Sequence, residues 1–205
     1  MSPSVRNSNP GVDLYWLPLG AGGHFVRMNG RVFEAVSARL ERRRPCNLYH
    51  SALEVHVPEG RFVIEQAPVR DGKGWARGVV AESAIGSRWA GRFRIFRYEV
   101  RRWRDGVIPD VDEAVASPQR LTDDPDLAQR VLDLAAEIPT PVWGRDELDV
   151  GEMWNSNSVI AWLIARCGLP AESIDPPAGG RAPGWCAGLA VARREASSPL
   201  PVPVR

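Results

Sequence analysis

The chain has 205 residues, of which 44% are hydrophobic and eight are tryptophan. This composition is ample for a buried core, so it excludes a wholly disordered chain and favours one domain. The formal net charge of +1 gives no overall attraction to nucleic acid or anionic membranes, so a nucleic-acid partner is not expected.

Cysteine spacing and hydropathy argue against a metal site, a secreted protein and a membrane-spanning protein. The three cysteines have no CxxC spacing, and three histidines leave few possible zinc ligand sets. We therefore expect free thiols, no metal and no cofactor. The N-terminus lacks the apolar region of a secretory signal, and no stretch approaches the roughly 20 apolar residues that span a bilayer. Together these features predict a soluble, cytoplasmic protein of undetermined oligomeric state.

The two ends of the chain differ in composition from the part between them. Residues 1–11 are rich in Ser, Asn and Pro, and residues 196–205 are rich in Pro. Proline fixes an extended backbone and removes hydrogen-bond donors. We therefore predict a flexible leader (1–11), a single globular α+β domain (12–195) and a flexible tail (196–205).

The first half of the chain carries one helix pattern among three strand patterns. A buried strand is predicted at 12–19, and a helix follows at 30–42 with its apolar residues on one face. Residues 48–57 alternate between apolar and polar, Pro58-Glu59-Gly60 makes a turn, and 61–69 returns. This is the pattern of a β-hairpin.

The second half supplies further strands and two helices. A weaker strand is predicted at 78–84 and a stronger one at 92–103, followed by helices at 124–137 and 157–166. The last helix is apolar almost all round, which predicts a central, buried position. The element order predicts an α+β fold, an antiparallel sheet packed against helices.

One predicted strand lies in a strongly basic segment. Residues 88–104 hold seven arginines and one glutamate. One hypothesis is an anion-binding groove in which Phe96, Tyr98 and Trp103 stack on a ligand. The other, which the near-zero net charge favours, is a solvated sheet face whose arginines pair with nearby acids.

The candidate site combines a strand histidine with a helix that starts in serine. His50 opens the 48–57 strand, and Ser156 stands at the start of the buried helix. A serine nucleophile needs a base within hydrogen-bond reach, and helix N-terminal amides can stabilise an oxyanion. A third group should orient the imidazole. Strand register leaves Glu54, His56 and Glu65 open as that group.

These two segments resemble the circularly permuted papain-like enzymes of the NlpC/P60 type, which include lecithin-retinol-acyltransferase-like and PPPDE-like members. The family pattern is a strand that opens with the catalytic histidine and, later, a helix that opens with Asn-Cys and an apolar run. Here Tyr49-His50-Ser51-Ala52-Leu53 matches the first element, and Asn155-Ser156-Asn157-Ser158-Val159 matches the second. The resemblance implies a permuted papain-like fold and acyl chemistry on an amide or ester.

This sequence departs from the family at the nucleophile, because Ser156 stands where the family has cysteine. A serine hydroxyl depends wholly on its base, whereas a thiol is intrinsically more nucleophilic. Three alternatives therefore stay open: a Ser/His acyl hydrolase or transferase, a non-enzymatic binding or scaffold protein that keeps the cleft, and an anion-binding module. Expected ligands are a small molecule, a peptide or a lipid.

The remaining predicted site residues would line the cleft or replace the nucleophile. Asn155 caps the helix beside the nucleophile, and the backbone of Asn157 would contribute to the oxyanion site. Tryptophans in the flanking loops are predicted to form the pocket wall; they are Trp143, Trp154 and Trp185. Cys186 is a weaker alternative source of a nucleophilic thiol.

Overall fold

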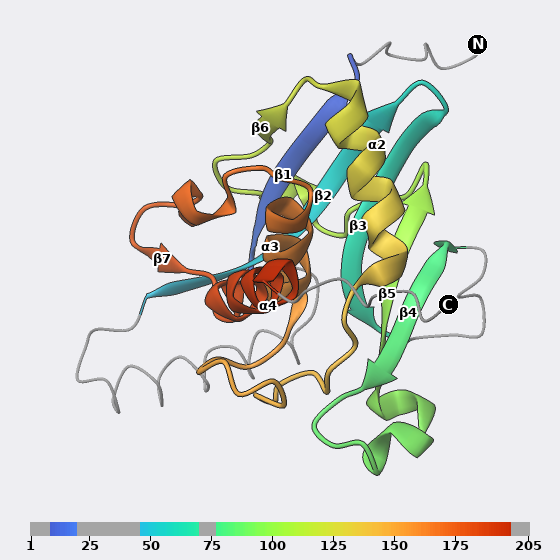
Figure 1. Ribbon diagram of the computed structural model, residues 1–205, viewed down its shortest axis with the longest axis vertical. Helices are drawn as coiled ribbons and strands as arrows, with labels where there is room; N and C mark the ends of the chain where they lie inside the picture. The colour runs from blue at the N-terminus through green and yellow to red at the C-terminus, as the bar shows by residue number, and fades with distance from the viewer. Residues whose placement is uncertain (1–8, 20–45, 70–76, 198–205) are drawn as a thin grey trace, which may run out of the picture.

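The structure is a computed structural model that describes residues 9–19, 46–69 and 77–197 (Figure 1). The predicted helix at 30–42, most of the predicted leader and most of the predicted tail lie outside the described residues. Within them, an antiparallel sheet is covered on one face by α-helices. The α+β prediction is therefore confirmed.

Seven strands form the sheet in the described part of the chain. Their bounds are β1 Gly11–Pro18, β2 Asn47–Val57, β3 Gly60–Pro68, β4 Val79–Ala84, β5 Arg97–Arg104, β6 Gln119–Thr122 and β7 Gly180–Arg181. The order is β4-β5-β3-β2-β1-β6, and all these pairings are antiparallel. The two-residue β7 adds a short parallel pairing to the start of β2.

Three α-helices of the described chain cover one face of this sheet (Figure 1). They are α2 Pro125–Leu134, α3 Ser156–Arg166 and α4 Trp185–Ser197. The predicted helices at 124–137 and 157–166 correspond to α2 and α3. As predicted, α3 is central, because every residue from Ser156 to Ile164 is buried.

The main core lies between the helices and one set of alternating strand residues. Leu53 and Val55 of β2 pack with Leu14 of β1 and with Ile160 and Leu163 of α3. A second, smaller apolar cluster lies on the opposite side of the sheet and includes Leu17, Ala52, Val63 and Ile108. The alternation of β2 between these clusters follows from the two-residue period of a strand.

Two predictions fail in the second half of the chain. The predicted strand at 92–103 begins only at Arg97, and the residues before it form two 3₁₀ turns, Ala90–Arg92 and Arg94–Phe96. The strand cannot start earlier, because Ala84 of β4 is the last partner of β5 and pairs with Arg97. Trp185, predicted to lie in a loop, is the first residue of α4.

Candidate functional site

The start of α3 is held by side chains of its own first turn. The Asn155 side chain accepts hydrogen bonds from the backbone N–H groups of Asn157 and Ser158, at 2.9 and 3.4 Å. In return, the backbone N–H of Asn155 donates to the Ser158 hydroxyl at 3.0 Å. This reciprocal capping box satisfies helix N–H groups that would otherwise lack partners.

Asn157 joins α3 to the first residues of β2. Its side-chain amide donates to the backbone oxygen of Tyr49 at 2.9 Å, and its side-chain oxygen accepts from the Ser51 hydroxyl at 2.9 Å. Asn157 and Ser51 are only 2% and 1% exposed. The helix start therefore contacts the residues on both sides of His50, so the structure brings together the two predicted segments.

The same junction extends to the segment that precedes α4. The amide of Asn155 donates to the backbone oxygen of Pro183 at 2.8 Å, and the Ser158 hydroxyl donates to that of Gly184 at 2.8 Å. A Cβ atom on Gly184 would lie 2.5 Å from the Asn155 side-chain oxygen, so this approach requires glycine. The predicted polar residues around Ser156 are thus engaged in buried structural hydrogen bonds.

The side chain of His50 belongs to the other face of β2. Its cross-strand partner is Leu17, which lies in the small cluster on the face away from α3. The neighbouring side chains of Tyr49 and Ser51 face the helices, the first in the main core and the second bonded to Asn157. Strand alternation therefore directs the imidazole away from the face that α3 covers.

Burial lowers the pKa of His50 from 6.5 to about 4, and the carboxylate of Asp110 partly opposes this effect. The imidazole is therefore neutral at physiological pH, but a base with such a low proton affinity is poorly matched to proton abstraction near pH 7. Within the described residues, no side chain forms a hydrogen bond with the ring that would orient it.

Ser156 occupies the first position of α3 and is 7% exposed. Its position at the positive end of a buried helix agrees with the prediction. Among the described residues, however, its hydroxyl has no hydrogen bond, and none joins it to His50. The expected nucleophile–base contact is not formed.

The candidates for the third member also have other partners. Glu65 pairs with Arg101 at 2.7 Å, and Arg101 in turn pairs with the buried Glu99 at 2.6 Å. His56 lies 2.9 Å from the carboxylate of Glu54. Neither Glu65 nor His56 contacts the His50 ring through a hydrogen bond, so the predicted triad is not assembled.

The three tryptophans predicted to line a cleft pack mainly in the core. Trp154 and Trp185 are 2% and 8% exposed, and Trp185 stacks at a tilt on Trp16 with ring centroids 5.2 Å apart. Trp143 is half-buried and contacts Tyr98 edge-to-face at 5.8 Å. These rings fill space between the sheet and the helices, and a substrate-binding role for them stays a prediction.

Cys186 does not provide an activated thiol in place of Ser156. Its side chain is exposed near the start of α4. Partial burial and the nearby carboxylate of Glu152 raise its pKa. Because the thiolate is the nucleophile, a raised pKa lowers its reactivity at neutral pH.

The described part of the chain contains no cluster of three His, Cys, Asp or Glu side chains that could hold a metal ion. It also contains no helix long and apolar enough to cross a membrane. No family model, curated protein or solved structure matches the chain.

A different surface feature was missed by the sequence interpretation. Residues 85–96, here called the aromatic lobe, connect β4 to β5 and project from one end of the sheet (Figure 1). Seven large hydrophobic side chains are exposed in the described residues, and four of them belong to this lobe: Trp89, Phe93, Ile95 and Phe96. The sequence signal for this surface is its dense mixture of aromatic and arginine residues, which also fits the strand predicted at 92–103.

Proposed function

We propose that the chain is a non-enzymatic binding protein, a relative of permuted papain-like enzymes that keeps their helix-on-strand junction without the acyl chemistry. In this proposal, the α3 start is a structural joint and the aromatic lobe is the contact surface for a partner. The observation that carries the proposal is the missing hydrogen bond between His50 and Ser156.

Three further observations support this proposal. The imidazole of His50 has a lowered pKa of about 4 and no orienting hydrogen bond. Glu65 is paired with Arg101, and Asn157 is used to bind the β2 backbone. A serine nucleophile has no activation of its own and needs a positioned base, so these features together argue against catalysis.

A Ser/His acyl hydrolase or transferase is the second candidate, and one observation favours it. Asn157, next to Ser156, touches Tyr49 and Ser51, the two neighbours of His50 in β2. For this candidate, the start of β2 would have to turn over on ligand binding, so that the imidazole moves from the far face of the sheet to the Ser156 hydroxyl.

Activity-based labelling separates the two candidates. The full-length protein and its Ser156→Ala variant are treated with a fluorophosphonate probe, and the adduct is located by peptide mass spectrometry. We expect no adduct on the peptide that contains Ser156. Ser158→Ala is a poor control because Ser158 caps the helix, so the exposed Ser197→Ala serves as the matched serine variant.

A fluorophosphonate adduct at Ser156 that disappears in His50→Ala would overturn the proposal and establish the hydrolase alternative. Circular dichroism of each variant confirms that the fold is retained, so that loss of labelling is not confused with unfolding.

A further inference from the structure

We infer that the aromatic lobe docks this protein on an anionic lipid bilayer. The inference rests on the proposed function, because it names the partner of the same binding surface. It requires an exposed apolar tip, basic side chains around that tip and a fixed scaffold beneath it.

The apolar tip is large for the exposed surface of a single loop. Trp89 is 67% exposed, Phe93 is 54% exposed and Ile95 is 75% exposed. The rings of Trp89 and Phe93 meet edge-to-face at 6.0 Å, so they form one continuous apolar surface. Contiguous exposed apolar side chains mark interaction sites, and tryptophan is well suited to the interface between lipid and water.

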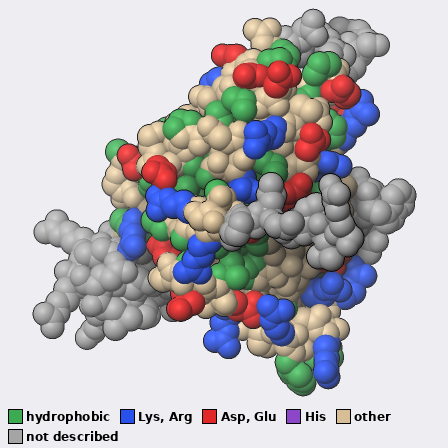
Figure 2. Space-filling model, in the orientation of Figure 1, with side chains coloured by type: hydrophobic (Ala, Val, Ile, Leu, Met, Phe, Trp, Pro, Cys, Tyr) green, Lys and Arg blue, Asp and Glu red, His purple; other side chains and the backbone are tan. Residues whose placement is uncertain are grey.

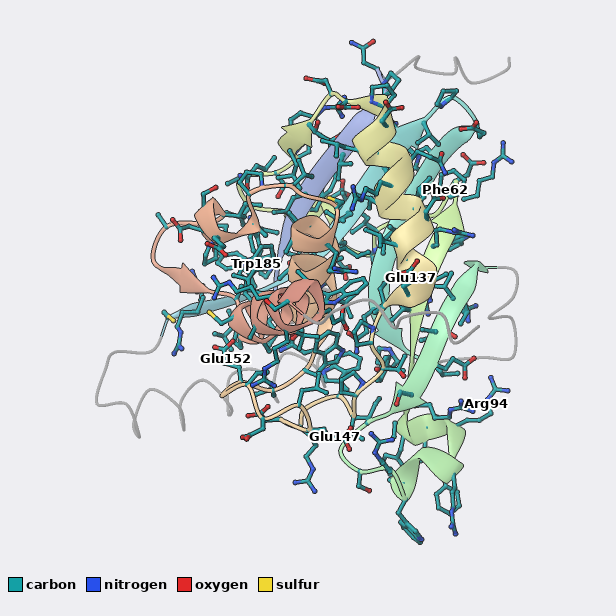
Figure 3. All side chains as sticks on the ribbon, viewed as in Figure 1. Phe62, Arg94, Glu137, Glu147, Glu152 and Trp185 are labelled. Carbon is teal, nitrogen blue, oxygen red and sulfur yellow. The ribbon has the colours of Figure 1, made fainter. Side chains whose placement is uncertain are left out.

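Arginines surround this tip. Arg88, Arg92 and Arg94 are exposed within the lobe, and Arg97 follows it. Figure 2 shows hydrophobic side chains at the lower end of the molecule with basic side chains on either side of them, and Figure 3 labels Arg94 on the lobe, at its outer side. Basic residues near an anionic membrane surface each contribute favourably to binding.

The acids that pair with Arg88 and Arg97 are held at the base of the lobe. Glu147 binds Arg88 through two contacts of 2.9 Å, and Glu82 binds Arg97 at 2.9 Å. Arg92 has no ion pair in the described part of the chain. Arg92 and Arg94 are exposed beside the rings and place positive charge there, although the net charge of the whole chain is only +1.

The lobe is fixed to the rest of the molecule by its backbone. The N–H of Ile85 donates to the oxygen of Phe96 at 2.7 Å and closes the loop, and the N–H of Gly86 donates to Trp143 at 2.9 Å. A Cβ atom on Gly91 would lie 2.6 Å from that of Ala84, so the lobe packs closely on β4. A preorganised tip loses little conformational entropy when it inserts.

This combination favours a lipid surface over a protein partner. A protein groove would require shape complementarity to this tip, whereas a bilayer accepts exposed apolar side chains without a matching surface. The arginines then face the headgroups while the rings enter the acyl boundary, which is the arrangement of interfacial anchors.

Vesicle flotation tests the inference with the full-length protein. Vesicles of phosphatidylcholine alone are compared with vesicles that also contain phosphatidylglycerol, at low and at high salt. We expect binding to the anionic vesicles only, weakened by salt because screening reduces the charge attraction. The Trp89→Ser/Ile95→Ser variant should bind at least about tenfold more weakly.

Substitution of the basic residues gives an independent measure. Arg92→Gln/Arg94→Gln should weaken binding by about fivefold for each arginine removed. The matched controls are Val107→Ser, an exposed valine beyond the far end of β5, and Arg130→Gln, an exposed arginine of α2. Both controls should bind like the wild type.

Two results overturn the inference. One is equal binding by the wild type and the Trp89→Ser/Ile95→Ser variant. The other is sedimentation showing that the lobe joins two copies of the chain, with dimers lost in that variant and no vesicle binding. Neither result bears on catalysis, which the fluorophosphonate adduct at Ser156 reports separately, so failure of the lipid partner and failure of the non-enzymatic proposal are distinguishable.

Discussion

The α3 start and the aromatic lobe differ in how they use their side chains. At the α3 start, polar groups such as Asn157 and Ser158 are at most 2% exposed and bonded to backbone on two other segments. In the lobe, Trp89 and Ile95 are more than half exposed and have no core to fill. A polar cluster that resembles an active site in sequence can therefore hold the fold together, while a loop of exposed aromatic and arginine residues presents the surface available for binding.

This comparison predicts that mutations at the α3 start destabilise the fold, whereas mutations in the lobe do not. The largest loss of stability is expected at Asn157. Asn157→Ala should lower the free energy of unfolding by about 3 kcal/mol, because it leaves Tyr49 and Ser51 with buried polar atoms that have lost their partner. Urea denaturation measures this change. Asn47→Ala, an exposed asparagine at the start of β2, is the matched control and should change stability by less than about 0.5 kcal/mol. Equal losses of stability at Asn157 and Asn47 would contradict the structural role of the α3 start.

The helix cap gives the next effect. Asn155→Ala should cost about 2 kcal/mol, at the upper end for an N-cap, because Asn155 also binds the backbone of Pro183. Asp124→Ala removes the cap of α2, which is exposed and makes no such second contact, and should cost about 1 kcal/mol. Thermal and urea unfolding of the two variants compare them directly. A larger loss for Asp124→Ala would show that α3 is not held as described.

His50 should make stability depend on pH. Its pKa in the folded protein is about 4, below the ordinary 6.5, so the unfolded chain binds a proton first as pH falls. Stability is therefore highest above pH 6.5 and falls progressively between 6.5 and 4. The loss by pH 5 should be about 1–2 kcal/mol, allowing for the partial exposure of the ring. His50→Gln should remove this part of the pH dependence, and an unchanged pH profile in that variant would contradict the buried neutral imidazole.

The smallest effect on stability is expected in the lobe. Trp89→Ser/Ile95→Ser should change the free energy of unfolding by less than about 0.5 kcal/mol, because both side chains are exposed. Chemical denaturation provides the measurement. A decrease of more than about 2 kcal/mol in the free energy of unfolding would mean that these side chains support the fold. That result would contradict a role of the lobe as a binding surface.

The sequence predicted the elements whose patterns are local. The alternation from Leu48 to Val57 and the turn after it correspond to β2 and β3, and the Asn155 cap with its apolar run corresponds to α3. These signals depend on the two-residue period of a strand and on helix capping, which do not require knowledge of distant contacts.

The missed elements depended on long-range packing. Helix α4 is absent from the sequence prediction, and its packing depends on Gly188: a Cβ there would lie 2.2 Å from the backbone oxygen of Ser158, so this glycine allows α4 to approach α3. The mixture of arginine and aromatic residues at 92–96 suggested a strand, but β4 ends at Ala84 and most of this segment forms 3₁₀ turns instead. Neither contact can be inferred from sequence neighbours.

The sequence predicted only part of the candidate site, because the rest depends on long-range packing. Convergence of the β2 and α3 starts followed from the motif, and Asn157 indeed binds on both sides of His50. The side of the strand to which the imidazole points depends on register and on which face the helices cover. Those are properties of the whole sheet.

The central claim is that the α3 start has a structural role and that His50 and Ser156 form no catalytic pair. Its most direct test is the pKa of a thiol placed at position 156. Ser156→Cys is alkylated with iodoacetamide across a range of pH, alone and combined with His50→Ala, and the rate is read on the peptide that contains residue 156. We predict the same apparent thiol pKa in both proteins, because the imidazole does not reach this position. A pKa that is low in Ser156→Cys and rises by about one unit or more when His50 is removed would contradict the account, since it would demonstrate a working pair.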